Sequence, residues 1–174
     1  MEPCVSALKN WTGKTHVRTI FDSSVDEFTN QSFLDKLMGK RNVALIAVTT
    51  DGDVFGGFYN RPVTQQCKEF RDPSIFAFSF ESHGRCATPQ RFVVGGMMKG
   101  KLLVSFWKSD VRGFVWFRVD GGGWFWLGNE GSNSYCYSMS KGFWDLEDTT
   151  LTGKSGLEKK DQHHCVRLVA FQLE

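Results

Sequence analysis

The chain has 174 residues, of which 41% are hydrophobic and 23% are charged, as in folded globular proteins and unlike disordered ones. Its formal net charge of +2 is too close to neutral to require nucleic acid or a membrane surface as a partner. Aromatic residues make up 14% of the chain, and because they favour strands we expect an all-β or an α+β fold.

The N-terminal residues lack the basic start and apolar run of a secretory signal, and no window approaches the ~20 apolar residues of a membrane span. We therefore expect no membrane insertion and a cytoplasmic or nuclear location. The chain shows no internal repeat, linker or low-complexity tract, so its length favours one domain over residues 1–174. Residues 1–15 are expected to form a loose N-terminal segment.

The first elements are expected to be a strand at 16–21 and a short helix between Thr29 and Gly39. Thr29 suits the N-cap position of this helix, and Gly39 suits the position just after its end. A capping box at 24–27 is an alternative start. The apolar residues of the predicted helix fall on one face: Phe33, Leu34, Leu37 and Met38.

An apolar run at 43–48 is followed by Asp51-Gly52, which predicts a hairpin with a two-residue type I′ turn. Gly56-Gly57 then interrupts the second strand, where the missing side chains let backbone or a bulky neighbour approach closely. At 75–80 three phenylalanines alternate with small residues, which predicts a half-buried strand.

The second half is expected to be β-rich. A polar stretch at 145–164 has no periodicity, and its ~20 residues are long for a connection, which suggests a mobile or functional loop. The strands predicted here lie at 101–107, 112–119, 124–127, 135–137 and 165–173.

Aromatic residues between 106 and 126 alternate onto both faces of adjacent predicted strands. Interleaved basic residues could make them a stacking platform for single-stranded nucleic acid. We favour the alternative that they line the inner face of a sandwich, since sheet packing uses aromatic side chains first. The residues of the candidate interaction surface are Lys99, Lys101, Lys108, Arg112, Arg118 and Trp124.

No pattern in the sequence assembles a catalytic, cofactor or metal site. Gly153-Lys154-Ser155 resembles the end of a phosphate-binding loop, but Asp148 occupies the place of the first glycine, and a carboxylate there would repel phosphate. His83 and Cys86 have the spacing of one metal-ligand pair, whereas His163-His164-Cys165 is contiguous and does not supply the second. We therefore expect no enzymatic activity, no cofactor and no metal.

The five cysteines are odd in number and widely spaced, and without a secretory signal we expect reduced thiols. Cys86 follows Arg85 and lies near His83 in an expected turn, and cationic neighbours favour the reactive thiolate. Cys165 lies beside two histidines and ranks second. These two cysteines are candidate redox-sensitive residues, and the alternative, which we favour, is that all five are passive.

Several segments resemble the TLDc domain, in the order in which that family has them. Residues 20–26 resemble its first strand and Ser-rich turn, and residues 33–37 resemble its first helix. Residues 54–58 resemble its Phe-Gly-Gly strand, and residues 72–80 resemble its Asp-x-x-x-Phe-x-Phe-Ser strand. Residues 169–173 resemble its closing strand.

This resemblance implies an α+β, mostly β fold, with a two-layer antiparallel β-sandwich, a few short peripheral helices and no accepted catalytic site. The resemblance also implies a role in protection against oxidative stress. It further implies, from the family alone, that the vacuolar proton-pumping ATPase is a protein partner. The chain departs from the family at 126–131, which lacks the usual Gly-Gly-x-Asp-Leu pattern. The expected function is a non-enzymatic protein-interaction module, with nucleic-acid binding through residues 99–126 as the alternative.

Overall fold

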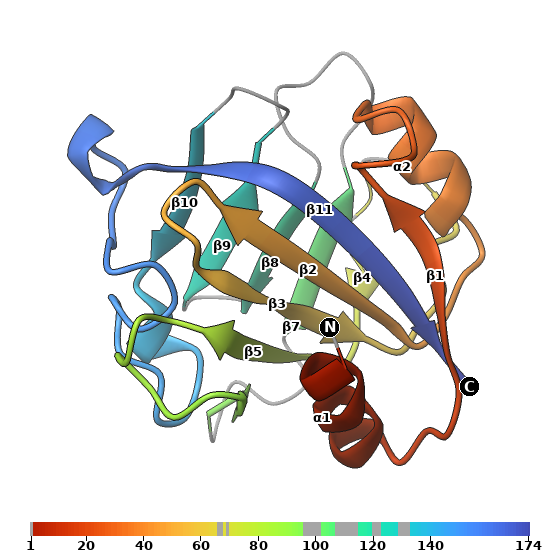
Figure 1. The fold of residues 1–174 in the computed structure, drawn as a ribbon, viewed down its shortest axis with the longest axis horizontal. Helices are drawn as coiled ribbons and strands as arrows, with labels where there is room; N and C mark the ends of the chain where they lie inside the picture. Colours follow the sequence, from red (N-terminus) through yellow and green to blue (C-terminus); the bar gives the residue numbers. More distant parts are fainter. Residues whose placement is uncertain are drawn as a thin grey trace.

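The computed structural model describes residues 2–65, 68, 70–95, 102–106, 115–119, 123–128 and 133–174, with the backbone alone at 102–106, 116, 118 and 124. Within this part the chain forms two antiparallel layers (Figure 1). The strands of the first layer, in spatial order, are β1 (Val17–Asp22), β11 (His163–Leu173), β2 (Val43–Thr49), β3 (Val54–Tyr59), β5 (Phe76–Glu81) and β6 (Gln90–Val93). Those of the second are β4 (Phe70–Arg71), β7 (Leu102–Phe106), β8 (Val115–Val119), β9 (Trp124–Leu127) and β10 (Asn133–Tyr137).

The layers join where β10 pairs with the start of β11, at Asn133 and Ser134. The long strand β11 then crosses the molecule and pairs with both β2 and β1 (Figure 1). Short helices lie at the periphery: α1 (Glu2–Thr12), α2 (Asn30–Leu37), η2 (Met139–Lys141) and η3 (Lys159–Asp161). The predicted two-layer, mostly β fold is confirmed.

Helix α2 begins and ends where the local signals predict. The Thr29 hydroxyl accepts a hydrogen bond from the Ser32 N–H, so it caps the helix start. Gly39 follows the last turn with a φ of +73°, a left-handed conformation that glycine adopts without strain. Neither α1 nor α2, the α-helices of the described residues, is long and apolar enough to cross a membrane.

Aromatic side chains fill the space between the two layers. Phe117 of β8 and Phe125 of β9 stack with ring centroids 4.9 Å apart, and Phe55 of β3 meets Phe125 edge-on at 5.5 Å. All three are fully buried. The predicted core role of the aromatic residues between 106 and 126 is therefore confirmed for Phe117 and Phe125, whose side chains the structure describes.

Gly56 and Gly57 are required by this packing. A Cβ atom on Gly57 would lie 2.5 Å from the ring of Phe117, and one on Gly56 would lie 1.8 Å from the carbonyl oxygen of Leu45. Both distances are far below van der Waals contact, so a side chain at either position would push the layers or strands apart. The predicted close approach at this pair is confirmed.

The N-terminal segment was expected to be loose, and this expectation is wrong. Residues 2–12 form α1, whose Ala7 and Leu8 are buried against the outer face of the first layer. There Trp11 stacks on Phe80 with centroids 5.7 Å apart and rings 5° from parallel. The strand at 76–81 is consequently buried on both faces rather than half-buried, because α1 covers the face that carries its phenylalanines.

The hairpin between β2 and β3 also differs from the predicted type I′ turn. The Gly52 N–H donates to the Thr49 carbonyl, and the Thr49 N–H donates to the Asp53 carbonyl, each at 3.0 Å, so the loop has three residues. Gly52 has a φ of +86°, whereas Asp51 keeps a negative φ. This arrangement spares Asp51 the strained left-handed conformation that a type I′ turn would impose on it.

The polar stretch at 145–164 packs against the body of the protein instead of forming a free loop. Leu146 and Leu151 are buried in the core between the layers. The carbonyl oxygens of Thr150 and Leu151 accept hydrogen bonds from the guanidinium of Arg85. Sparse buried residues fix this stretch without any periodicity that a sequence pattern could reveal.

Candidate functional site

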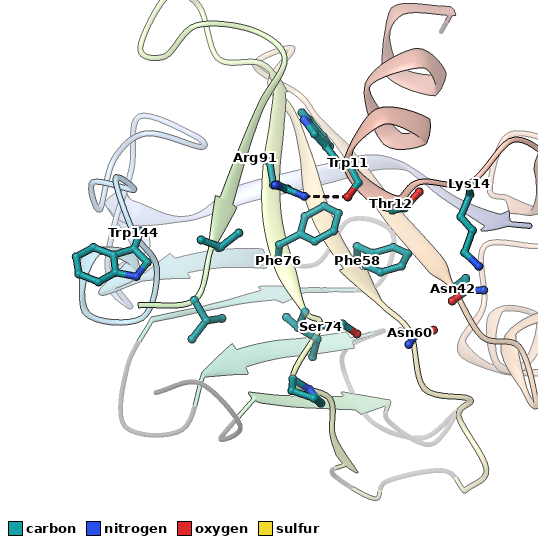
Figure 2. Close-up of a pocket in the computed structure, with 14 residues that line it drawn as sticks. Trp11, Thr12, Lys14, Asn42, Phe58, Asn60, Ser74, Phe76, Arg91 and Trp144 are labelled. Atoms are coloured by element: carbon teal, nitrogen blue, oxygen red, sulfur yellow. Dashed lines mark hydrogen bonds between the residues drawn. The ribbon is translucent and has the colours of Figure 1, made fainter. Parts of the chain in front are cut away.

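A groove of about 620 Å³ lies on the outer face of the first layer, next to the C-terminal end of α1 (Figure 2). Its 14 described lining residues come from the end of α1 and the turn after it, from β3, β5 and β6, from the segments that flank β2, β3, β5 and β6, and from the segment after η2. Among the residues that the structure describes, the lining includes two cations, Lys14 and Arg91, and no Asp or Glu. The groove is the feature of the described residues best suited to bind another molecule.

The floor of the groove is aromatic. Phe58 of β3 and Phe76 of β5 stack there with centroids 4.9 Å apart. Trp11 meets Phe76 edge-on at 6.1 Å from the α1 side. Because successive side chains of a strand alternate between its faces, β5 presents its phenylalanines outward and its small residues to the core.

Arg91 is held in a fixed position above this floor. Its Nη1 donates a 2.8 Å hydrogen bond to the Trp11 carbonyl at the end of α1, and its guanidinium lies 5.4 Å from the centre of the Phe76 ring. One donor is used in this bond, and an arginine has five. No described carboxylate pairs with Arg91 or with Lys14, so both positive charges remain uncompensated.

Two asparagines line the groove near Lys14 (Figure 2). Asn42 has a φ of +54°, and its backbone is fixed by hydrogen bonds to Asn60 and Leu173. Neither asparagine side chain hydrogen-bonds another described residue. Their amides are therefore available to a bound molecule as donors and acceptors.

The opposite end of the groove is apolar and exposed. Trp144 is 55% exposed and Val93 is 43% exposed. The backbone N–H of Trp144 donates a 2.8 Å hydrogen bond to the Val93 carbonyl. Tryptophan is enriched among the residues that contribute most to binding at protein interfaces, so Trp144 is a candidate contact residue. Sequence reasoning missed this site, since its residues are far apart in the chain and only folding brings them together.

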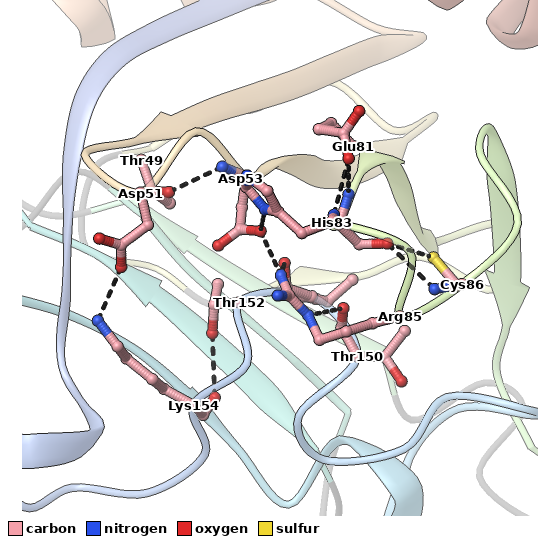
Figure 3. Close-up of polar contacts among 12 residues, drawn as sticks. Thr49, Asp51, Asp53, Glu81, His83, Arg85, Cys86, Thr150, Thr152 and Lys154 are labelled. Atoms are coloured by element: carbon pink, nitrogen blue, oxygen red, sulfur yellow. Dashed lines mark hydrogen bonds and ion pairs between the residues drawn. The ribbon is translucent and has the colours of Figure 1, made fainter.

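A second polar cluster joins three loops at the tip of the β2–β3 hairpin (Figure 3). Its centre is the carboxylate of Asp53, which is 1% exposed. Oδ1 of Asp53 pairs with the guanidinium of Arg85 and, at 2.9 Å, with Nδ1 of His83. Since Arg85 also donates to the 150–151 backbone, the cluster ties the hairpin to two other loops. The sequence suggested only a turn role for Asp53.

Three further ionisable groups lie near this cluster: Lys154, Asp51 and His163. The Lys154 ammonium lies 2.8 Å from the carboxylate of Asp51, and this pairing lowers the pKa of Asp51. His163, at the start of β11, is 1% exposed, and neither of its ring nitrogens has a hydrogen-bond partner among the described residues. Burial lowers the pKa of His163 to about 4, so the ring is neutral near pH 7.

The two candidate redox cysteines lie in different environments. Cys165 is 2% exposed, and burial raises its pKa to about 12, so it lacks the exposure and the low pKa on which the prediction depended. Cys86 is half-buried, with Sγ 3.1 Å from the Ser82 hydroxyl. The guanidinium of Arg85 is engaged by Asp53 rather than by the neighbouring thiol. The prediction for Cys165 is corrected, and that for Cys86 stays a prediction.

The candidate interaction surface of basic and aromatic residues falls mostly outside the described part of the chain. Lys99, Lys101, Lys108 and Arg112 lie outside it. For Arg118 and Trp124 the structure gives the backbone alone, which places them opposite each other in the β8–β9 ladder. Nucleic-acid binding through residues 99–126 therefore stays a prediction. In the described residues no group of three or more His, Cys, Asp or Glu could hold a metal ion.

The motifs that suggested a family have structural roles. The carboxylate of Asp22 accepts two hydrogen bonds from Arg167 of β11, at 3.0 and 2.6 Å, and this pairing holds the pKa of Asp22 well below its usual range. Asp72 is buried and accepts hydrogen bonds from the backbone of Asn60, Arg61 and Ser74. These motif residues thus position strands and turns rather than reacting groups.

Comparison with known proteins agrees with these motifs. A family model described as the TLDc domain matches residues 5–93, which is just over half of the chain. No curated protein matches the sequence. On the strength of the family match, the chain belongs to the TLDc domain family.

Proposed function

We propose that this protein is a non-enzymatic protein-interaction module that acts in the response to oxidative stress, in the cytoplasm or the nucleus. The observation that carries the proposal is the groove, which joins exposed apolar side chains to two uncompensated cations. Membership of the TLDc family supports the link to oxidative stress, and the family resemblance makes the vacuolar proton-pumping ATPase the first partner to test.

The geometry of His83 supports a non-catalytic role. In a catalytic triad, the histidine needs a protein nucleophile within hydrogen-bond reach of the ring nitrogen opposite its orienting carboxylate. Nδ1 of His83 binds Asp53, but Nε2 has no hydrogen-bond partner among the described residues. Asp53 and His83 therefore resemble the acid and the base of a catalytic triad, but the described residues supply no nucleophile to complete it.

Affinity capture with matched variants tests the interaction. The immobilised protein, its Trp144→Ala variant and a Val25→Ala control are incubated with lysate from untreated and peroxide-treated cells. Val25 is 85% exposed and does not line the groove, so the control removes an exposed apolar side chain elsewhere. We expect specific proteins to be retained by the wild type and the control and lost by Trp144→Ala.

The outcomes separate the parts of the proposal. If the wild type and Trp144→Ala retain the same proteins, the groove is not the interaction site. If groove-dependent capture is identical before and after peroxide, the stress-response part of the proposal is wrong. Thermal denaturation of each variant shows that any loss of capture is not a loss of folding.

A further inference from the structure

We propose that the groove binds an extended, acidic segment of a partner protein, with an apolar residue of that segment against Trp144 and its carboxylates along Arg91 and Lys14. This inference rests on the proposed interaction function and adds the chemistry of the partner. The lining side chains run from Trp144 at one end, past Arg91 and Phe76, to Lys14 and Asn42 at the other (Figure 2).

Charge complementarity identifies the sign of the partner. In the described part of the chain, two cations and no carboxylate line the groove, and neither cation has an acidic partner there. The buried carboxylate of Asp72 does not line the groove, and it already accepts hydrogen bonds from the backbone N–H groups of Asn60, Arg61 and Ser74. The two lining cations would therefore attract an anionic segment along the groove.

The position of Arg91 makes the attraction specific. Its hydrogen bond to the Trp11 carbonyl and its place over Phe76 fix the guanidinium before a ligand arrives. A fixed side chain loses little entropy when it binds a carboxylate, and a guanidinium can bind both carboxylate oxygens at once. Lys14 makes no described interaction and supplies a second, adaptable charge.

The apolar surfaces favour a peptide over a nucleic acid. Phe58 and Phe76 are each 5% exposed, so their faces are not open for a base to stack on. The exposed side chain of Val93 lies beside Trp144, which suits an aliphatic or aromatic side chain of a peptide. The free amides of Asn42 and Asn60 can hydrogen-bond the backbone of an extended chain.

Fluorescence anisotropy with the full chain tests the proposal. Labelled peptides of equal length share an apolar half, and their other half is rich in glutamate, in glutamine or in lysine. We expect the glutamate-rich peptide to bind about tenfold more tightly than the lysine-rich one, with the glutamine-rich peptide between them. Added salt should lower the affinity for the glutamate-rich peptide most, because the attraction between this peptide and the groove is electrostatic.

Charge variants locate the site. Lys14→Glu replaces an attraction with a repulsion and should lower the affinity for the glutamate-rich peptide about fivefold. Arg91→Gln should lower this affinity by a similar factor. The control is Lys159→Glu, which changes the net charge as much as Lys14→Glu does but lies in η3, outside the groove. It should leave binding unchanged.

Three results would overturn the proposal. The first is that no peptide binds or that all bind equally. The second is that both groove variants bind the glutamate-rich peptide as the wild type does. The third is that a single-stranded oligothymidylate binds more tightly than the glutamate-rich peptide and that the Trp144→Ala variant loses this binding. If instead Trp144-dependent capture of a partner persists without any acidic preference, the proposed function stands and this inference fails.

Discussion

Acidification should destabilise the protein through His163. The ring is buried against Phe55, with centroids 5.6 Å apart, and within the described part of the chain neither of its nitrogens has a hydrogen-bond partner. Charged groups also act on it: Lys154 and His164 lower its pKa further, and Asp53 and Asp51 raise it. Burial is the largest cause, and the pKa falls from 6.5 to about 4.

The sign and size of the effect follow from proton linkage. The unfolded chain binds a proton at this site below about pH 6.5, whereas the folded chain does so only below about pH 4. Stability from the neutral ring is therefore complete above about pH 7 and is lost as the pH falls towards 4. At about pH 5 the free energy of unfolding should be about 2 kcal/mol lower than at about pH 8.

Urea unfolding followed by tryptophan fluorescence, at about pH 8 and about pH 5, measures this difference. A His163→Leu variant has no ring to protonate, so its pH dependence should be smaller by about 2 kcal/mol. A His16→Gln variant removes an exposed histidine and should behave as the wild type. If His163→Leu keeps the full pH dependence of the wild type, the burial of a neutral His163 does not explain it.

Three further predictions concern packing, charge and thiol access. Gly57→Ala should lower the free energy of unfolding by about 2 kcal/mol, measured by urea titration, because the added methyl lies 2.5 Å from a phenyl ring of β8. Asp53→Asn should cost about 2 kcal/mol by the same assay, since it leaves a partly buried arginine without its carboxylate, whereas the exposed Asp51→Asn should cost much less. Peroxide followed by thiol labelling and peptide mapping should modify Cys86 before Cys165, and equal rates would contradict the burial argument.

The sequence alone determined those elements whose boundaries depend on interactions between residues that are close together in the chain. The cap at Thr29 and the glycine at Gly39 delimit α2 because both act through hydrogen bonds and backbone angles of the adjacent turn. The pair Gly56-Gly57 marked a close approach because an absent side chain constrains its own backbone position. The alternation of phenylalanines identified β5 as a strand.

Only the tertiary structure decided what covers each element and which distant residues meet. The sequence cannot show that α1 lies on the outer face of β5, because that contact depends on how a short helix docks against a strand far along the chain. The same holds for the groove, where Lys14, Arg91 and Trp144 meet, and for the burial of Cys165 and His163. Burial, pKa and pocket shape depend on contacts between segments far apart in sequence, whereas caps and turns depend on their neighbours alone.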